Sequence, residues 1–379
     1  MKGRKLWFVG IGGAGLSAYA QLARAWGAEV GGWDKVRTPY LAPLDGVQVE
    51  ISPEPVVPDG WEVVVSSAYP SVPGLRRAEF LRELVAVRPS VVVAGTHGKG
   101  TTAAMIAYAL HENGQDPAWL IGAPVPQLGS NAGAGEGTLV VEGDESDRTV
   151  FTLPARIAVI TNIELDHHSE FASLAELEGA FDKWLATVPQ VVRDAPAYGG
   201  ELAVPGEHNR RNAGAALAAL ELLGVDGRDA VARFAGTGRR FEVHELDGLT
   251  VVDDYGHHPS EVAATIAAAR ERFPDRRIRV LFQPHLYSRT RHLATELGAA
   301  LAAADDVTVT DIYAAREQPV DGVSGKLVVD ALSDTGVLAA WMPTVEQAAT
   351  HVRRQARTGD VVLVIGAGDV DRAVGLLNG

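Results

Sequence analysis

A glycine-rich loop that contains a lysine follows an apolar run near residue 91. The run Val91–Val93 leads into Gly95-Thr96-His97-Gly98-Lys99-Gly100-Thr101-Thr102. Backbone N–H groups in such a loop can wrap phosphate oxygens, and the Lys99 ammonium can neutralise the phosphoryl group that is transferred. Gly100 stands where a hydroxyl residue usually follows the lysine, so the magnesium-binding hydroxyl has to come from Thr101 or Thr102. The segment predicts a loop for the phosphates of a nucleoside triphosphate.

Carboxylates follow two later apolar runs. Leu139–Val141 leads into the acidic segment Glu142–Asp147, and Ile157–Thr161 leads into Asn162-Ile163-Glu164-Leu165-Asp166-His167-His168. The carboxyl ends of parallel strands share one edge of a sheet, so both segments are expected beside the lysine loop. Oxygen ligands suit Mg²⁺, which bridges phosphates in phosphoryl transfer. A zinc site at His167 and His168 is disfavoured, because the chain has no cysteine and no H-E-x-x-H spacing.

A second glycine-rich loop lies at the start of the chain. Gly10, Gly12 and Gly15 satisfy G-x-G-x-x-G after an apolar run, and Asp34 ends the next expected strand about 20 residues later. Glycines there let the backbone approach a diphosphate at a helix N-terminus, while the carboxylate takes a ribose hydroxyl. The loop predicts a diphosphate nucleotide and leaves open whether it is NAD or another one.

The composition limits the classes to which this protein can belong. The chain has 379 residues, 46% hydrophobic and 22% charged, with a net charge of −14 and no cysteine. These values exclude a disulfide framework and a thiol nucleophile, and the acidity argues against an extended nucleic-acid surface. No apolar run approaches the roughly 20 residues of a membrane span, and the N-terminal run is too short for a signal peptide. We expect a cytoplasmic enzyme.

Short apolar runs that alternate with Ala/Leu-rich helical patterns predict parallel sheets covered by helices. We expect an α/β fold of three domains: a Rossmann-like domain over 1–88, a central P-loop ATPase domain over 89–237, and a Rossmann-like domain over 238–379. An irregular connection is expected over Gln190–Pro205. The expected strands are Leu6–Val9, Val63–Val65, Val91–Val93, Leu139–Val141, Ile157–Thr161, Val251–Val252, Ile278–Phe282, Val307–Val309 and Val361–Ile365.

In their order along the chain, these motifs resemble the Mur ligase family, and most closely its members that add L-alanine to UDP-N-acetylmuramate. The resemblance covers nearly the whole chain. Besides the segments above, it rests on Val64–Ala68, Gly206-Glu207-His208-Asn209-Arg210-Arg211-Asn212, Gly236–Phe241, Asp253-Asp254-Tyr255-Gly256-His257-His258-Pro259 and Phe282-Gln283-Pro284-His285.

The resemblance implies an ATP- and Mg²⁺-dependent amide-bond ligase whose small-molecule substrates are UDP-N-acetylmuramate and L-alanine, acting as a monomer or homodimer without nucleic acid or membrane. Catalysis is assigned to Lys99, Glu142, His167 and His257, and metal binding to Thr101, Glu142 and His167. The implied ATP-binding residues are Gly95, Thr96, Gly98, Lys99, Gly100, Thr101, Thr102, Asn209, Asn212, Arg240 and Asp254. The implied substrate-binding residues are Gly12, Gly13, Ala14, Gly15, Asp34, Ser66, Ser67, His97, Glu145, Ser146, Tyr255, His285 and Arg289.

The sequence departs from the family pattern in three ways. Gly100 replaces a hydroxyl residue. Leu286 stands in place of the arginine of a common His-Arg-Tyr motif, and the chain is shorter than typical members. These departures keep open a related ligase for another amino acid or peptide, and a non-catalytic nucleotide-binding regulator. An NAD-dependent oxidoreductase, the third alternative, leaves Lys99 and Glu142 without a role.

Overall fold

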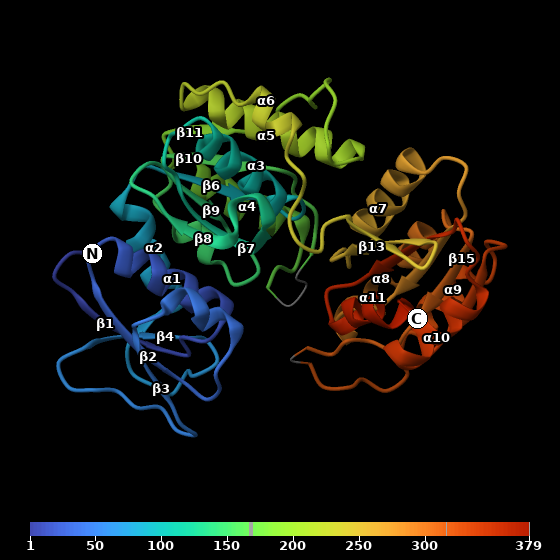
Figure 1. Cartoon of the computed structure of the whole chain (residues 1–379), viewed down its shortest axis with the longest axis horizontal. Coiled ribbons are helices and arrows are strands. Elements are labelled where there is room, and N and C mark those ends of the chain that lie inside the picture. Colours follow the sequence, from blue (N-terminus) through green and yellow to red (C-terminus); the bar gives the residue numbers. More distant parts are fainter. Residues whose placement is uncertain (167–169, 316, 379) are drawn as a thin grey trace. The chain divides into compact units, whose positions relative to one another are not determined.

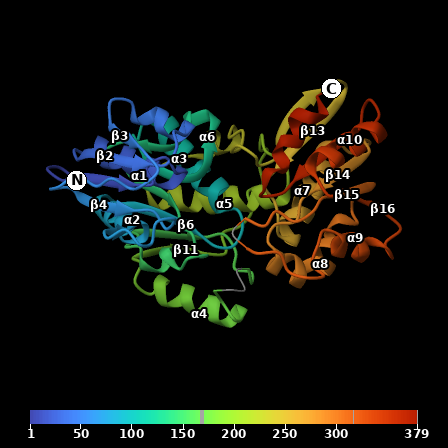
Figure 2. The ribbon, with the colours of Figure 1, turned by 90° about the horizontal axis from the view of Figure 1, so that it is seen from below.

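The computed structural model describes residues 1–166, 170–315 and 317–378, and within them the chain forms three sheets, one after another along the sequence (Figures 1 and 2). All nine expected apolar runs form strands, although Thr161, the last residue of one run, lies just beyond the end of its strand. The α/β fold class is therefore confirmed.

The first sheet is entirely parallel, in the order β3-β2-β1-β4-β5. One face packs against helices α1 and α2 through an apolar core, and the other buries Trp7 and Trp33 beneath loop residues. Its elements are β1 (Lys5–Val9), α1 (Ala14–Ala25), β2 (Glu29–Asp34), η1 (Pro39–Leu44), β3 (Gln48–Ile51), β4 (Glu62–Val65), β5 (Leu75–Arg76) and α2 (Arg77–Val87).

The second sheet has the order β11-β10-β6-β9-β7-β8, and only the β7–β8 pair is antiparallel among its described pairings. Helix α3 starts at Lys99 and packs on β6, β7 and β9. The elements are β6 (Ser90–Ala94), α3 (Lys99–Glu112), β7 (Ala118–Val125), η2 (Pro126–Leu128), β8 (Ser130–Ala134), β9 (Leu139–Glu142), η3 (Thr149–Thr152), β10 (Ile157–Ile160), α4 (Leu174–Leu185), β11 (Gln190–Val192), α5 (Glu207–Leu222) and α6 (Arg228–Ala232). Strand β11 opens the segment 190–205 that was expected to be irregular.

The third sheet has the order β12-β13-β17-β14-β15-β16, with β12 antiparallel at one edge. Its two faces are covered by different helices: α7, α8 and α9 on one, α10 and α11 on the other. The elements are β12 (Glu242–Leu246), β13 (Leu249–Asp254), α7 (Pro259–Arg272), β14 (Ile278–Phe282), α8 (Tyr287–Leu301), β15 (Asp306–Val309), α9 (Lys326–Leu332), β16 (Leu338–Trp341), α10 (Val345–Gln355), β17 (Val361–Ile365), η4 (Asp369–Asp371) and α11 (Arg372–Leu377).

The described chain divides into two compact units. Unit 1 comprises residues 1–166, 170–200 and 211–234, and unit 2 comprises 201–210 and 235–378. Within unit 1, helix α1 packs against β7 and β8 of the second sheet. The Trp26 indole N–H donates to the Gly135 carbonyl at 3.4 Å, and the Arg88 guanidinium lies 4.9 Å from the centre of a Trp26 ring. The first two sheets thus share one core.

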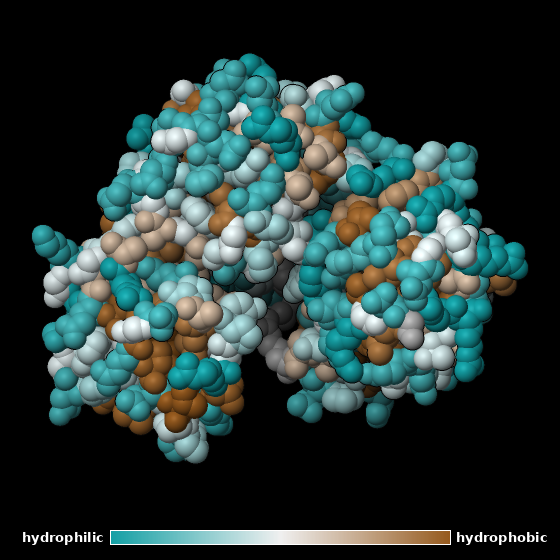
Figure 3. All heavy atoms as spheres, in the orientation of Figure 1, coloured by the Kyte–Doolittle hydropathy of each residue, from teal (hydrophilic) through white to brown (hydrophobic). Residues whose placement is uncertain are grey.

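Figure 3 shows hydrophilic side chains over much of the visible surface, with hydrophobic patches among them. Among the described helices, none combines the length and the hydropathy that crossing a bilayer requires. The domain boundaries placed at residues 88/89 and 237/238 remain predictions.

Candidate functional site

The lysine loop connects β6 to α3 through two glycines with positive φ. Gly95 has φ +122°, and Gly98, the N-cap of α3, has φ +78°. A Cβ atom at Gly95 would lie 2.5 Å from the Asn162 carbonyl oxygen, and one at Gly98 would lie 2.3 Å from Oδ1 of Asn212. Both positions therefore require glycine for conformation and for space.

The segment after β10 fixes the shape of this loop. Asn162 accepts hydrogen bonds from Thr96 N–H through its carbonyl and from His97 N–H through Oδ1, both at 2.9 Å, and its Nδ2 donates back to the His97 carbonyl. The Thr161 hydroxyl donates to the same carbonyl at 2.6 Å, and the Thr96 hydroxyl to the Glu164 carbonyl at 2.9 Å. The two segments that the sequence placed at one sheet edge therefore meet there.

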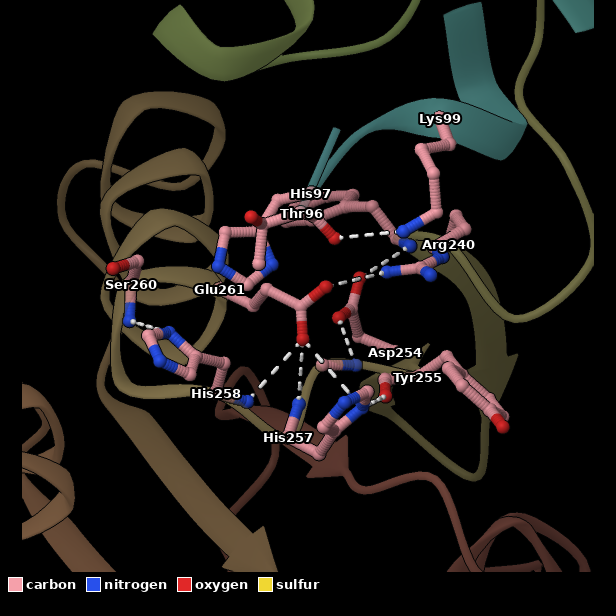
Figure 4. Close-up of polar contacts among 12 residues, drawn as sticks. Thr96, His97, Lys99, Arg240, Asp254, Tyr255, His257, His258, Ser260 and Glu261 are labelled. Atoms are coloured by element: carbon pink, nitrogen blue, oxygen red, sulfur yellow. Dashed lines mark hydrogen bonds and ion pairs between the residues drawn. The ribbon is translucent and has the colours of Figure 1, made fainter. Parts of the chain in front are cut away.

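Lys99 lies inside the loop that precedes it. Its Nζ donates to the carbonyls of Gly95 (2.7 Å) and Thr96 (3.0 Å; Figure 4) and lies 3.0 Å from Oε2 of the buried Glu145. Burial works to lower the pKa of Lys99, but the carboxylates of Glu145 and Glu142 outweigh it, so the pKa is raised. Lys99 is therefore a cation held where phosphates would meet the loop.

Glu142, the last residue of β9, faces the start of α3. A Cβ at Gly100 would lie 3.1 Å from its Oε2, which also accepts the Gly122 N–H at 2.6 Å. Thr101 and Thr102 are buried in the first turn of α3, and the Thr102 hydroxyl has no hydrogen-bond partner among the described residues. These oxygen donors are of the kind that Mg²⁺ prefers. The metal ligand assigned to His167 lies outside the described residues.

The N-terminal glycine loop places Asp34 close to its backbone. The Gly12 N–H donates to Asp34 Oδ2 at 2.7 Å, and Lys35 N–H donates to Oδ1 at 2.7 Å. Ser66, after β4, lies beside Gly10, where a Cβ would come within 2.8 Å of the Ser66 Cβ. Gly13 is the N-cap of α1, which begins at Ala14 and Gly15, whereas Ser67 is exposed. The expected association of the glycine loop with Asp34 and Ser66 is thus present, although both Asp34 oxygens already accept backbone N–H groups.

Other predicted residues of unit 1 lie close to the lysine loop. Asn212, on α5, contacts Gly98 as described above, and His97 Nε2 lies 3.5 Å from Glu164. The Ser146 N–H donates to Asp144 Oδ1 at 2.8 Å in the turn after β9 that also carries Glu145.

In unit 2, the turn between β13 and α7 gathers several predicted residues (Figure 4). Asp254 accepts the N–H groups of Phe241 (2.9 Å) and Gly256 (2.8 Å). Burial lowers the pKa of His208, which lies near Asp254, so this histidine is held neutral. Asn209 Nδ2 donates to the Pro205 carbonyl at 2.7 Å.

Glu261, which sequence reasoning missed, organises this turn. Its Oε2 accepts the N–H groups of His257 (3.0 Å) and His258 (3.2 Å), and its Oε1 lies 3.4 Å from Arg240 Nη1. Glutamate at the third helical position after an N-cap, with Pro259 at the first, is the capping-box pattern that signals this role.

A row of rings crosses the carboxyl ends of β13 and β14. Tyr255 and His257 make an edge contact (5.8 Å between centres), His257 and His285 lie 5.6 Å apart, and Tyr313 stacks on His285 at 5.8 Å. Arg289 Nη1 lies 3.0 Å from His285 Nδ1. Tyr313 was not predicted, because it lies 28 residues beyond His285 in an irregular segment.

Leu286, one of the departures noted above, has φ +68° and is the N-cap of α8. Positive φ is unfavourable for a residue with a Cβ and branched Cγ. Its N–H donates to the Tyr313 carbonyl at 3.0 Å and its carbonyl accepts from Thr290, which hold the conformation.

Two family descriptions match the chain: "Mur ligase middle domain" over residues 93–191 and "Mur ligase, glutamate ligase domain" over residues 239–368. Both matched regions contain residues of the sites described above.

Curated relatives match over almost their whole length. A UDP-N-acetylmuramate–L-alanine ligase from Rubrobacter xylanophilus is 37% identical, covering 97% of this chain and 98% of the relative. One from Acidothermus cellulolyticus is 36% identical, covering 95% and 91%. The alignment with the R. xylanophilus relative extends over 438 positions, more than the 379 residues of this chain, so that relative has segments that this chain lacks.

Among solved structures, the UDP-N-acetylmuramate–alanine ligase of Thermotoga maritima superimposes with a TM-score of 0.78 at 27% identity, covering 98% of both chains. The likeness therefore extends across all three sheets.

Proposed function

The chain belongs to the Mur ligase family, and we propose that it joins L-alanine to the carboxylate of UDP-N-acetylmuramate with cleavage of ATP, a step in making peptidoglycan precursors. The observation that carries the proposal is the buried Lys99 ammonium, held by two loop carbonyls and Glu145 at the start of α3. The near full-length identity to alanine-adding ligases supports the choice of substrates.

The chemistry has to overcome the poor reactivity of a carboxylate toward an amine. In the proposed reaction a muramyl carboxylate oxygen attacks the γ-phosphorus of ATP, the bond to the β-phosphate oxygen breaks, and ADP leaves. The alanine amine, in its neutral form, then attacks the acyl carbon, and the tetrahedral intermediate expels inorganic phosphate. Lys99 and the N–H groups at the start of α3, rather than those of Thr96 and His97 that donate to Asn162, stabilise the charge that builds up on the phosphoryl oxygens.

Magnesium, when bound, supplies further charge neutralisation between the phosphates. Glu142 and Thr101 would hold it, together with His167. Gly100, which faces Glu142, has no side chain and so offers no hydroxyl to the metal. The hydroxyl of Thr101, the next residue, would take that role.

The remaining roles are those that the family resemblance implies. Asn209 and Asn212 face adenine, Arg240 faces the phosphates, and Asp254 faces the ribose. The ring row with His257, together with Tyr255, His285 and Arg289, receives the amino acid. The loop 12–15 with Asp34, Ser66 and Ser67 receives the UDP moiety, and His97, Glu145 and Ser146 lie toward the muramyl group. The reaction takes place in the cytoplasm, where ATP and UDP-sugars are made.

Leu286, a departure from the family pattern, is the residue on which a second candidate function within the same chemistry rests. An arginine at this position would supply a guanidinium near His285 and Arg289, and leucine supplies none. A ligase of this family that prefers another amino acid, such as glycine or L-serine, is the alternative.

The test is phosphate release with ATP, Mg²⁺ and UDP-N-acetylmuramate across a panel of amino acids, with product masses. L-Alanine is expected to give the highest kcat/KM and a product heavier than the sugar nucleotide by one alanyl residue. Turnover with glycine or L-serine but not L-alanine would establish the alternative, and phosphate release independent of the UDP-sugar would contradict both.

A further inference from the structure

Arg77 is a basic residue of unit 1 that no motif singled out, and it lies against the N-terminal glycine loop. It is the first residue of α2. A Cβ at Gly15 would lie 3.3 Å from Arg77 Nε and 3.8 Å from both Cζ and Nη2. The edge of the guanidinium formed by Nε and Nη2 therefore faces the first turn of α1. This is the edge that binds two oxygens of one phosphate or carboxylate at once.

The other side of the guanidinium is anchored. Nη1 lies 3.8 Å from Asp147 Oδ2, and Cζ lies 5.9 Å from the ring centre of Tyr19, one turn along α1 from Gly15. The Asp147 pair is long and its side chains are 38% and 46% exposed, so it orients Arg77 with little stabilisation of its own. Nε, by contrast, is buried and has no hydrogen-bond partner among the described residues. A buried donor in this condition is costly unless a ligand accepts from it.

The glycine loop lies beside a negative charge that would repel a bound diphosphate. Its Gly12 N–H already donates to the carboxylate of Asp34, which is buried beside the loop, and Gly13 N–H donates to the Gly10 carbonyl. A diphosphate at this loop would meet the remaining N–H groups of the α1 first turn together with the negative charge of Asp34. Arg77 places a cation at that same turn.

We propose that Arg77 binds the diphosphate of the UDP-sugar through its Nε–Nη2 edge, with Asp147 and Tyr19 as the residues that orient it. The assignment rests on the proposed function, because it takes the loop 12–15 as the UDP site. It makes Arg77 a binding residue contributed by α2, and it couples the UDP site to the turn after β9 that also carries Glu145, the partner of Lys99.

The test compares two ligands that differ only in the diphosphate. Dissociation constants of UDP and of uridine are measured by ligand-observed NMR titration for the wild type, Arg77→Ala and Arg77→Lys. Arg77→Ala is expected to weaken UDP about 10- to 100-fold, as for loss of a charged hydrogen-bonded pair, and to change uridine by less than about twofold. Arg77→Lys keeps the charge but loses the paired donors, so an intermediate loss is expected.

Arg82→Ala is the matched control, because Arg82 is an exposed arginine of the same helix, and UDP affinity is expected to be unchanged. ATP affinity of each variant reports an intact fold. If Arg77→Ala does not fold, Arg77→Lys decides the question by the same ratio of UDP to uridine affinity.

Equal weakening of UDP and uridine, or no change in either, would overturn the assignment and leave Arg77 a structural contact between α2 and α1. A wild-type protein that binds ATP but not UDP would instead overturn the proposed sugar-nucleotide substrate. The two failures are therefore distinguishable.

Discussion

The Lys99 ammonium lies 3.0 Å from Oε2 of Glu145, a residue only 1% exposed. A buried carboxylate requires a partner, and here the partner is the cation to which the proposed reaction assigns a role. The same ion pair therefore contributes to the stability of the fold and to the proposed catalysis.

Replacing Lys99 with methionine is expected to lower kcat for phosphate release by at least about 10²–10³-fold, because charge on the transferring phosphoryl loses its stabilising donor. It also leaves Glu145 buried without its cation, which costs stability.

The double variant Lys99→Met/Glu145→Gln separates these effects. Its midpoint of urea unfolding is expected to recover toward that of the wild type while activity stays lost. Recovery of turnover in the double variant would show that Lys99 acts only through the fold.

Gly98→Ala is expected to abolish measurable ATP binding and to destabilise unit 1, because the new Cβ would meet Asn212 Oδ1 at 2.3 Å at a φ of +78°. The control is Gly114→Ala, with φ +67° and no atom within 4 Å of the new Cβ. That variant carries only the left-handed conformational cost of about 1–2 kcal/mol and retains ATP binding. Equal effects of the two variants on calorimetric ATP titrations would contradict the crowding argument.

Asp253 makes stability depend on pH in the direction opposite to an ordinary paired carboxylate. Burial raises its pKa to about 6, although Arg239 opposes the shift. Between the ordinary value of 3.8 and about 6, the native state binds this proton more tightly than the unfolded state, so native stability falls as pH rises through that window.

The free energy of unfolding of the wild type minus that of Asp253→Asn is therefore expected to fall by about 2 kcal/mol from pH 4 to pH 6.5 and then to stay level. Urea unfolding across this range measures it. A difference that rises with pH would mean that the ion pair with Arg239, rather than burial, determines the direction of the Asp253 pKa shift.

Arg279 forms a buried ion cluster at the amino end of β14, remote along the strand from His285. Its Nε lies 2.7 Å from Asp360, its Nη1 pairs with Asp306, and its Nη2 donates to the Gln355 carbonyl. Arg279→Met is expected to cost about 3–5 kcal/mol of unfolding free energy with KM for the amino acid unchanged, because Asp306 and Asp360 both lose the buried guanidinium that pairs with them.

Arg277→Met is the comparison, because Arg277 is 46% exposed and lies 3.3 Å from the same Asp306. A loss below about 1 kcal/mol is expected there. Similar losses at 277 and 279 would show that burial does not decide the strength of these pairs.

The sheet pattern could be predicted from the sequence because buried parallel strands are continuous apolar runs, as in Val91–Val93 and Val361–Ile365. Short or mixed edge strands carry no such run. Strand β11 has three residues, and β8 contains Gly133 within Ser130–Ala134, so neither was expected.

The phosphate loops could also be predicted from a local pattern, because their glycines recur at a fixed spacing that the backbone conformation of such loops requires. The order of the motifs along the chain then pointed to the family. Arg77, Glu261 and Tyr313 were not, because their importance comes from contacts between elements. The packing of α1 on the second sheet also had no local signal, since it depends on the meeting of Trp26, Arg88 and Gly135 across the chain.

The shared core of the first two sheets has a consequence for substrate choice. Ile11 and Leu16, on either side of the loop 12–15, and Ala94, at the end of the strand before the lysine loop, belong to one apolar cluster of unit 1, so a change in the interval between the two loops has to disturb that cluster. If the loop 12–15 binds UDP and Lys99 faces the phosphates as proposed, a nucleotide-sugar whose carboxylate lies one sugar nearer or farther is expected to be a poor acceptor, because its carboxylate would not reach the phosphates.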